Sequence, residues 1–239
     1  MRLVDSHCHL VNMKKGYKPT EGVLPVTVGY SHSTNVKTVA IAKELGIPFV
    51  LGIAPQTAMK SGLGSLDEWV DFIRKNPPNA VGEIGLDYHW AENEQHIENE
   101  KAVFRRMLSL ADELQKPVVI HARKATHDVL DFLQLRQEEK PFMMHFFSGT
   151  LAEAQRAVGM GGLISITPLH SKSRRTIIKS LDLEHMVVET DAPYVGRTPE
   201  AVKDAVDYIC EVKSLDFDIV AKKTAENSLR FFGVKGPRR

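Results

Sequence analysis

The chain has 239 residues, of which 43% are hydrophobic and 26% are charged, and its formal net charge is +1. This length and composition fit one α/β domain with a full hydrophobic core, so a second domain is not required. Proteins that grip long duplex DNA nonspecifically usually carry a strong basic excess, and the near-neutral balance argues against that class. A polyanionic substrate would have to be held by local charge or by a metal ion.

The cysteines and the N-terminal residues indicate where in the cell the protein is expected. Cys8 and Cys210 lie far apart, which is typical of reduced thiols, and we expect a cytoplasmic location. Residues 1–10 lack the long apolar run of a signal peptide, and no stretch approaches the ~20 apolar residues that span a bilayer. We therefore expect no membrane association, and no obligate protein partner is evident.

Short apolar runs alternate with amphipathic segments along the chain. The runs are often β-branched, as parallel strands buried on both faces are. We expect strands at Leu3–Leu10, Val23–Val28, Pro48–Ile53, Ala80–Leu86, Pro117–Ala122, Phe142–Phe147, Gly162–Ile166 and His185–Glu189.

Helical periodicity fills the intervals between these strands. Helices are expected at Thr34–Leu45, from Ser65, at about 93–115, from Thr150 to Gly159, at Ser171–Leu181, from Pro199 and at Asp218–Phe232. Gly46 should end the first of them as a C′ glycine, and Ser65 with Glu68 predicts a capping box. No linker divides the chain, so we predict a single (β/α)8 TIM-type barrel domain over 1–239 with a frayed tail at 235–239. An open doubly wound sheet is the alternative.

Side chains that bind metals recur where the predicted strands end. They are His7, His9, Glu83, His121, His145 and Asp191. They belong to the first, fourth, fifth, sixth and eighth predicted strands, whose C-terminal ends would face one another across the rim of a barrel. This spread favours the barrel over an open sheet. It predicts a site for one or two divalent ions at that rim and metal-assisted hydrolysis.

Each of these signals is weak alone. Histidine pairs occur on ordinary surfaces, and a single histidine after an apolar strand is more often a packed core residue. Glu83 fits a buried salt bridge as well as a metal site, because a buried carboxylate is costly unless it is paired or metal-bound. A carboxylate can also bridge two cations. Asp191 is a candidate ligand, a candidate general base, or both.

Further residues are candidates for supporting roles. Asp5 and Glu189 share strand faces with the candidate ligands, and Asp5 is a candidate acceptor for the second nitrogen of an imidazole. Arg123 shares the face of His121 and would bind a phosphate or carboxylate, although a rim ion pair fits equally well. Among the remaining histidines, His89 is the candidate substrate contact.

A basic cluster follows the seventh predicted strand. Its members are Lys172, Arg174 and Arg175. They fit a solvated helix face better than a patch that steers a nucleic-acid strand.

The site residues lie in motifs that resemble those of the TatD family of metal-dependent deoxyribonucleases, within the amidohydrolase-like barrels. The motifs follow one another through most of the chain: DSHCHL, AVGEIGLDYHW, LADELQKPVVIHAR, HFFSG, VVETDAPY and AENSLRFFG. The resemblance implies a β/α barrel with a dinuclear metal site. The implied ligands are His7 and His9 for one ion, His121 and His145 for the other, and Glu83 as the bridge. Asp191 is then a ligand and the base.

Two departures from the family pattern concern the substrate. The third strand of the family commonly ends in G-x-H-P, and this chain has Ala54 in place of that histidine. After Asp191 the family often carries a longer loop with an N-x-P element, whereas here residues 194–199 run almost directly into a helix. Both changes would alter the substrate pocket.

The resemblance implies cleavage of phosphodiester bonds in DNA by a metal-bound hydroxide, with Asp191 and Glu83 as catalytic residues. The weak net charge favours short or single-stranded ends. Two divalent ions are expected, and Zn, Mn and Mg all remain open. The first alternative is an amidohydrolase that acts on a C–N or ester bond of a small molecule. The second is a barrel that binds a metal or a partner without turnover.

Overall fold

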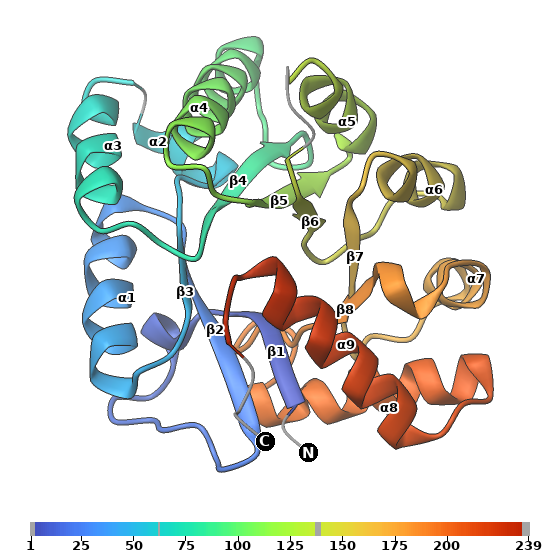
Figure 1. Cartoon of the computed structure of the whole chain (residues 1–239). Helices are drawn as coiled ribbons and strands as arrows, with labels where there is room; N and C mark the ends of the chain where they lie inside the picture. Colours follow the sequence, from blue (N-terminus) through green and yellow to red (C-terminus); the bar gives the residue numbers. More distant parts are fainter. Residues whose placement is uncertain (1–2, 62, 137–139, 236–239) are drawn as a thin grey trace.

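The fold is an eight-stranded parallel sheet whose strands follow one another in chain order (Figure 1). The computed structural model describes residues 3–61, 63–136 and 140–235. The strands are β1 (Leu3–Cys8), β2 (Val23–Gly29), β3 (Phe49–Leu51), β4 (Ala80–Asp87), β5 (Val118–Arg123), β6 (Phe142–Met144), β7 (Leu163–Ile166) and β8 (Met186–Val188). All eight predicted strands are present.

The sheet closes into a barrel through the segment that follows β8. Cys8 forms a parallel bridge with Ala192. Asp191 N donates to His7 O at 2.9 Å, and His9 N donates to Ala192 O at 2.7 Å. The predicted β/α barrel is therefore confirmed. The open-sheet alternative is wrong, because backbone hydrogen bonds join the two ends of the strand order.

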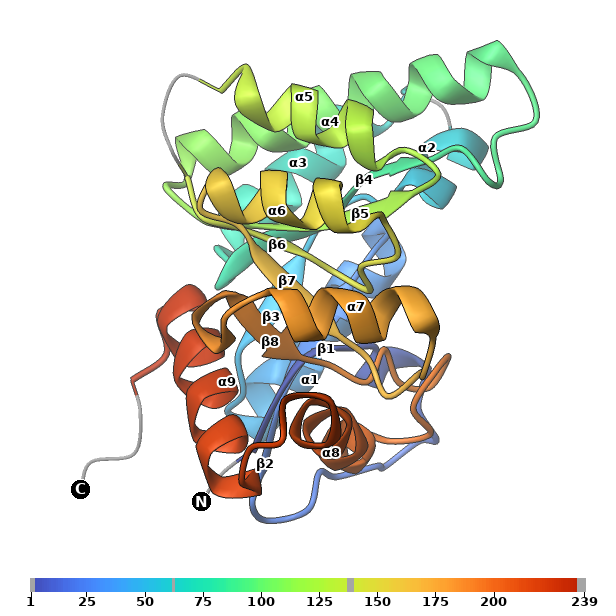
Figure 2. The same ribbon diagram turned by 90° about the vertical axis from the view of Figure 1, so that its right-hand side faces the viewer.

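Most helices surround the strands (Figures 1 and 2), and the last helix crosses in front of them in Figure 1. The helices are α1 (His32–Leu45), α2 (Pro55–Ser61), α3 (Leu66–Lys75), α4 (Glu94–Glu113), α5 (Thr126–Gln134), α6 (Leu151–Gly159), α7 (Lys172–Ser180), α8 (Val202–Lys213) and α9 (Phe217–Phe231). Short 3-10 turns are η1 (Leu10–Asn12), η2 (Leu183–His185) and η3 (Pro199–Ala201). None of the helices in the described ranges combines the length and apolar composition needed to cross a bilayer.

Some local predictions were right and others were wrong. Gly46 ends α1 in the left-handed conformation with φ 63°. Ser65 stands at the N-cap of α3, but its side chain makes no capping hydrogen bond, so the predicted capping box is absent there. The first strand ends at Cys8, and the pairing of β1 with β2 shifts register between Asp5 and Cys8. Two helices, α2 and α5, were not predicted. The predicted tail lies outside the described residues apart from Lys235.

An apolar layer fills the barrel interior. One buried cluster takes at least one side chain from every strand and continues to Phe231 and Phe232 at the end of α9. Val119 on β5 and Met143 on β6 belong to it. Residues two apart on a strand face the same side, so the next inward positions along these strands lie one layer above the apolar core.

Candidate metal centre

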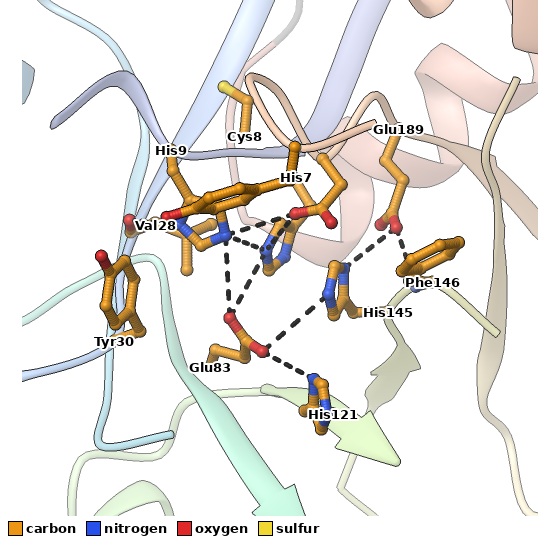
Figure 3. Close-up of polar contacts among 12 residues, drawn as sticks. His7, Cys8, His9, Val28, Tyr30, Glu83, His121, His145, Phe146 and Glu189 are labelled. Carbon is orange, nitrogen blue, oxygen red and sulfur yellow. Dashed lines mark hydrogen bonds and ion pairs between the residues drawn. The ribbon is translucent and has the colours of Figure 1, made fainter. Parts of the chain in front are cut away.

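The layer above the apolar core is polar. His121 lies two residues after Val119, and His145 lies two residues after Met143, so both imidazoles occupy inward positions at the C-terminal ends of their strands. Figure 3 shows these rings pointing toward Glu83. Every second residue of these strands therefore points into the barrel, from the apolar core up to the candidate ligands. The candidate ligands form the uppermost layer of inward-pointing side chains.

The first group of candidate ligands joins the two ends of the chain. His7 Nε2 lies 3.2 Å from His9 Nε2. Asp191 Oδ1 lies 3.3 Å from His9 Nε2 and 3.8 Å from His7 Nε2. Glu83 Oε2 lies 3.7 Å and 3.8 Å from the same two nitrogens. All four side chains are buried, and we call them the first group.

The second group lies on the other side of Glu83. His121 Nδ1 is 2.8 Å from Glu83 Oε1, and His145 Nε2 is 3.9 Å from the same oxygen. The rings of His7 and His145 stack with their centroids 3.6 Å apart, which holds the two groups side by side. Each carboxylate oxygen of Glu83 therefore faces a separate set of imidazole nitrogens (Figure 3).

The donor atoms suit divalent cations. Two sets of three residues can each offer one ligand atom per residue with all three atoms within 4.8 Å of one another: His7, His9 and Asp191, and Glu83, His121 and His145. Asp191 Oδ1 is buried and has no hydrogen-bond partner. An unsatisfied buried carboxylate oxygen beside two imidazole nitrogens is costly in a purely structural cluster, and a cation would satisfy it. Asp191 also has φ 48°, a strained backbone conformation for a residue other than glycine, as is common at functional sites.

Carboxylates hold the outer nitrogens of the second group. Asp87 Oδ2 lies 2.8 Å from His121 Nε2, and Glu189 Oε1 lies 2.9 Å from His145 Nδ1. An acceptor on the outer nitrogen places the imidazole proton there and leaves the inner nitrogen free for a metal. Glu189 also accepts from Phe146 N at 2.7 Å, which fixes its orientation.

The first group has a different support. His9 Nδ1 lies 3.1 Å from Val28 O, so a backbone carbonyl plays the part of the outer acceptor. His7 Nδ1 is buried without a partner. Asp5, the predicted acceptor for an imidazole, instead accepts from Thr190 N at 2.9 Å, from Thr190 Oγ1 at 2.6 Å and from His7 N at 3.3 Å. The predicted acceptor role of Asp5 is wrong, because its carboxylate binds the hydroxyl and amide groups of Thr190 across the barrel seam and the amide of His7.

Asp87 was not among the predicted site residues. Its carboxylate contacts His121, accepts from Gln56 Nε2 at 2.8 Å and accepts from His89 N at 3.1 Å. The signal was present in the sequence, because Asp87 lies four residues after Glu83 on the same strand and therefore has the same parity.

The pKa values of the histidines in the candidate metal centre are shifted in opposite directions. Burial lowers the pKa of His121, but its contacts with Asp87 and Glu83 outweigh this and raise it to about 9. Burial likewise opposes protonation of His145, but Glu189 and then Glu83 raise its pKa to about 10. His7 has a pKa well below its ordinary value, first because of burial and then because of neighbouring imidazoles.

Metal binding at neutral pH is therefore expected to release about two protons, one from each imidazole of the second group. In protein without metal, protonation of His121 and His145 stabilises the fold fully below their ordinary pKa of 6.5, and this contribution is lost as pH rises through about 9 and 10. Calorimetric titration with Zn²⁺ or Mn²⁺ at pH ~7.5, in buffers of different ionisation enthalpy, measures the proton count. The number of protons released is the slope of the observed binding enthalpy against the ionisation enthalpy of the buffer. A slope near zero would contradict the assignment of His121 and His145 as protonated before the metal binds.

A cavity of about 1130 Å³ opens over both groups. Its wall includes Glu83, His121, His145 and Asp191, together with aromatic and basic side chains farther out. A cavity of this size exceeds most small-ligand pockets. It can hold a substrate that extends well beyond the reacting bond.

The basic residues near the cavity differ in their surroundings. Arg123 lines the cavity, and its guanidinium carbon lies 5.6 Å from the ring centroid of the exposed Trp90. The neighbouring His89 is exposed, and the residues that line the cavity do not include it. Arg174 also lines the cavity and is 8% exposed, so its predicted place on a solvated helix face is wrong. Arg175 is exposed and pairs with Glu211, which agrees with its predicted place on a solvated helix face.

Ala54 lies in the cavity wall where the family pattern has histidine. It is buried and its methyl group offers no hydrogen bond. The amide of Gln56, two residues later at the start of α2, lies 3.5 Å from His121 Nε2 and is bonded to Asp87. The shortened loop after Asp191 places the exposed Tyr194 in the cavity lining as well.

Comparisons with known proteins agree with this geometry. A family model described as TatD related DNase matches residues 4–233. The chain is 28% identical to the uncharacterized metal-dependent hydrolase MJ1582 of Methanocaldococcus jannaschii, over 97% of both chains. It is 28% identical to human deoxyribonuclease TATDN3, over 96% of this chain and 94% of that one.

A solved structure gives the same architecture. The TatD homologue YjjV of Escherichia coli K12 superposes with a TM-score of 0.83 at 23% identity, covering 98% of this chain and 99% of that one. This likeness concerns the barrel fold. From the family match across nearly the whole chain, we conclude that the protein belongs to the TatD-related DNase family of metal-dependent hydrolases.

Proposed function

We propose that this protein is a deoxyribonuclease that hydrolyses phosphodiester bonds with two divalent ions. The observation that carries the proposal is the orientation of Glu83, whose two carboxylate oxygens face two separate sets of imidazole nitrogens. A family match to TatD-related DNases and the name of human TATDN3 support DNA as the substrate.

The first group would hold one ion and the second group the other, with Glu83 shared between them. Bound ions would supply positive charge that polarises the phosphodiester and lowers the pKa of the attacking water. Asp191 lines the cavity and its Oδ1 has no hydrogen-bond partner, which supports Asp191 as the acceptor of the proton of that water.

The remaining residues orient this machinery. Asp87 and Glu189 hold the rings of His121 and His145 through their outer nitrogens. Arg123 at the cavity wall has a guanidinium free of ion pairs among the described residues, and it would bind a phosphate oxygen of the substrate. The near-neutral net charge supports short or single-stranded ends rather than long duplex DNA.

A substrate panel tests the proposal. Purified protein is first analysed for metal content, stripped with a chelator and reconstituted with Zn²⁺, Mn²⁺ or Mg²⁺. We expect cleavage of a labelled DNA single strand that is lost on stripping and restored by metal, with slower cleavage of blunt duplex. RNA of the same sequence measures sugar preference. Hydrolysis of cyclic amides or lactones without cleavage of any oligonucleotide would instead favour the amidohydrolase alternative.

A further inference from the structure

A buried guanidinium lies in the cavity wall beyond the metal centre. Arg174 belongs to α7, lines the cavity and is only 8% exposed. Its Nη1 donates to Leu169 O at 2.6 Å, while its buried Nε has no hydrogen-bond partner. Within the described ranges, Arg174 forms no ion pair with a carboxylate. Its positive charge is therefore left without a neutralising partner.

A second arginine with a largely buried side chain has a carboxylate partner. The side chain of Arg136 is 7% exposed and pairs with Asp112, although its Nε, like that of Arg174, has no hydrogen-bond partner. Burying a charge without such a partner is unfavourable, because the lost hydration is not replaced. Burial lowers the pKa of Arg174, and the nearby Tyr208 and Glu189 oppose this. The carboxylate oxygens of Glu189 are already engaged by Ser165, Phe146 and His145. Arg174 thus has the character of an anion-binding group.

The surroundings of Arg174 favour an anion. It lies in the first turn of α7, a nine-residue helix whose N-cap Ser171 accepts from Arg174 N at 3.1 Å. Helix N-termini attract anions through their free N–H groups and the helix dipole. The hydroxyl groups of Ser171 and Ser173 lie 3.2 Å apart, and both residues line the cavity. The positive charge, two hydroxyl groups and the helix terminus therefore meet on one wall.

The side chain of Phe146 lies between Arg174 and the candidate metal centre. The guanidinium carbon of Arg174 lies 5.8 Å from the ring centroid of Phe146, and that ring lies 6.1 Å from the ring of His145. Arg174 is therefore separated from the second group by one aromatic side chain. An anion bound there would lie in the same cavity as the reacting phosphodiester, but beside the metal centre and not on it.

We propose that Arg174 and the first turn of α7 form a subsite for a second phosphate of the substrate, next to the phosphodiester that is cleaved. This inference rests on the proposed nuclease function and extends it to substrate selection. The preferred substrate is then a nucleic-acid strand with a phosphate beyond the cleaved bond, because a guanidinium binds phosphate oxygens in a bidentate way. A dinucleotide with a single internal phosphate would leave the subsite empty.

The test compares dinucleotides with and without an additional terminal phosphate, placed at either the 5′ or the 3′ end. We expect the metal-loaded enzyme to cleave one of the two phosphorylated forms with a kcat/KM about tenfold higher, mainly through a lower KM. Arg174→Gln should bring the ratio between the two substrates close to one. Arg175→Gln, at the adjacent exposed position that pairs with Glu211, should keep the ratio of the unmodified protein. Equal ratios in the unmodified protein and in Arg174→Gln would overturn the proposal.

A binding measurement separates this inference from the nuclease proposal. Metal-loaded protein is titrated with thymidine 3′,5′-bisphosphate and with each thymidine monophosphate. Tighter binding of the bisphosphate that is lost in Arg174→Gln and kept in the control Arg175→Gln supports the subsite, even where no oligonucleotide is cleaved. Cleavage of oligonucleotides together with equal affinity for mono- and bisphosphate in all three proteins would reject the subsite and leave the nuclease proposal standing. Circular dichroism of each variant verifies that it is folded.

Discussion

Replacing Glu83 with Gln is expected to abolish metal-dependent cleavage while the fold is kept. The amide has nearly the same shape, but only its oxygen has a lone pair to donate to a cation, whereas its NH2 group has none, so it cannot bridge two cations. Loss of the bridge should lower kcat/KM by about 10³-fold, which corresponds to about 4 kcal/mol of transition-state stabilisation. The measurements are cleavage of a labelled strand and the metal content of the purified variant.

The matched control is Glu113→Gln. Glu113 is an exposed glutamate at the end of α4 whose partner is Arg74, far from the cavity lining. This variant removes the same charge from the surface and should leave metal content and cleavage as they are. Full activity in Glu83→Gln, with two ions still bound, would exclude Glu83 as the bridging ligand and with it the proposed arrangement.

Replacing Asp87 with Asn is expected to have the second largest effect, although Asp87 touches no candidate metal position. The carboxylate accepts from His121 Nε2, which keeps the proton on the outer nitrogen. An amide that donates to Nε2 would favour the opposite tautomer and place a proton on Nδ1, which faces Glu83. We expect metal affinity at the second group to fall 10- to 100-fold, a magnitude that is typical when such a supporting partner is lost.

Metal titration of Asp87→Asn should therefore show one ion bound as in the unmodified protein and one bound weakly. Asp207→Asn serves as the control, because Asp207 is an exposed aspartate on α8 that pairs with Lys203. Excess metal should restore part of the cleavage in Asp87→Asn. Two ions bound with unchanged affinity would show that Asp87 does not set the tautomer of His121.

The positions of the strands and of the candidate metal ligands at their ends were readable from the sequence for one physical reason. A buried parallel strand is a short apolar run, and the residue that ends it faces the rim of the barrel. His121 after Val118–Ile120 and His145 after Phe142–Met144 both follow this rule. Polar residues directly after such runs therefore identify the rim.

The supporting contacts could not be derived in the same way, because they depend on register and on closure. Asp87 contacts His121 since β4 and β5 pair with Gly85 opposite His121, and that register includes a shift between Val81 and Ile84. The partner of Asp5 is Thr190, far along the chain, and the two meet only because the barrel closes.

The sequence also could not predict which face of a helix points toward the barrel. The three basic residues Lys172, Arg174 and Arg175 look alike in sequence, and only their rotation about the axis of α7 separates a buried charge from exposed ones. Helix α2 spans seven residues, which is too short for its periodicity to stand out. Helix α5 carried a usable pattern in Val129, Leu130 and Leu133.

The seam between β1 and the segment after β8 has a consequence for biosynthesis. The first group takes its two imidazoles from the opening residues of the chain and its aspartate from position 191. During translation these ligands are separated by almost the entire polypeptide, so no early fragment can assemble that group. Under the proposed two-ion arrangement, full metal loading would require the completed barrel, and a prematurely terminated product would lack the group that includes Asp191.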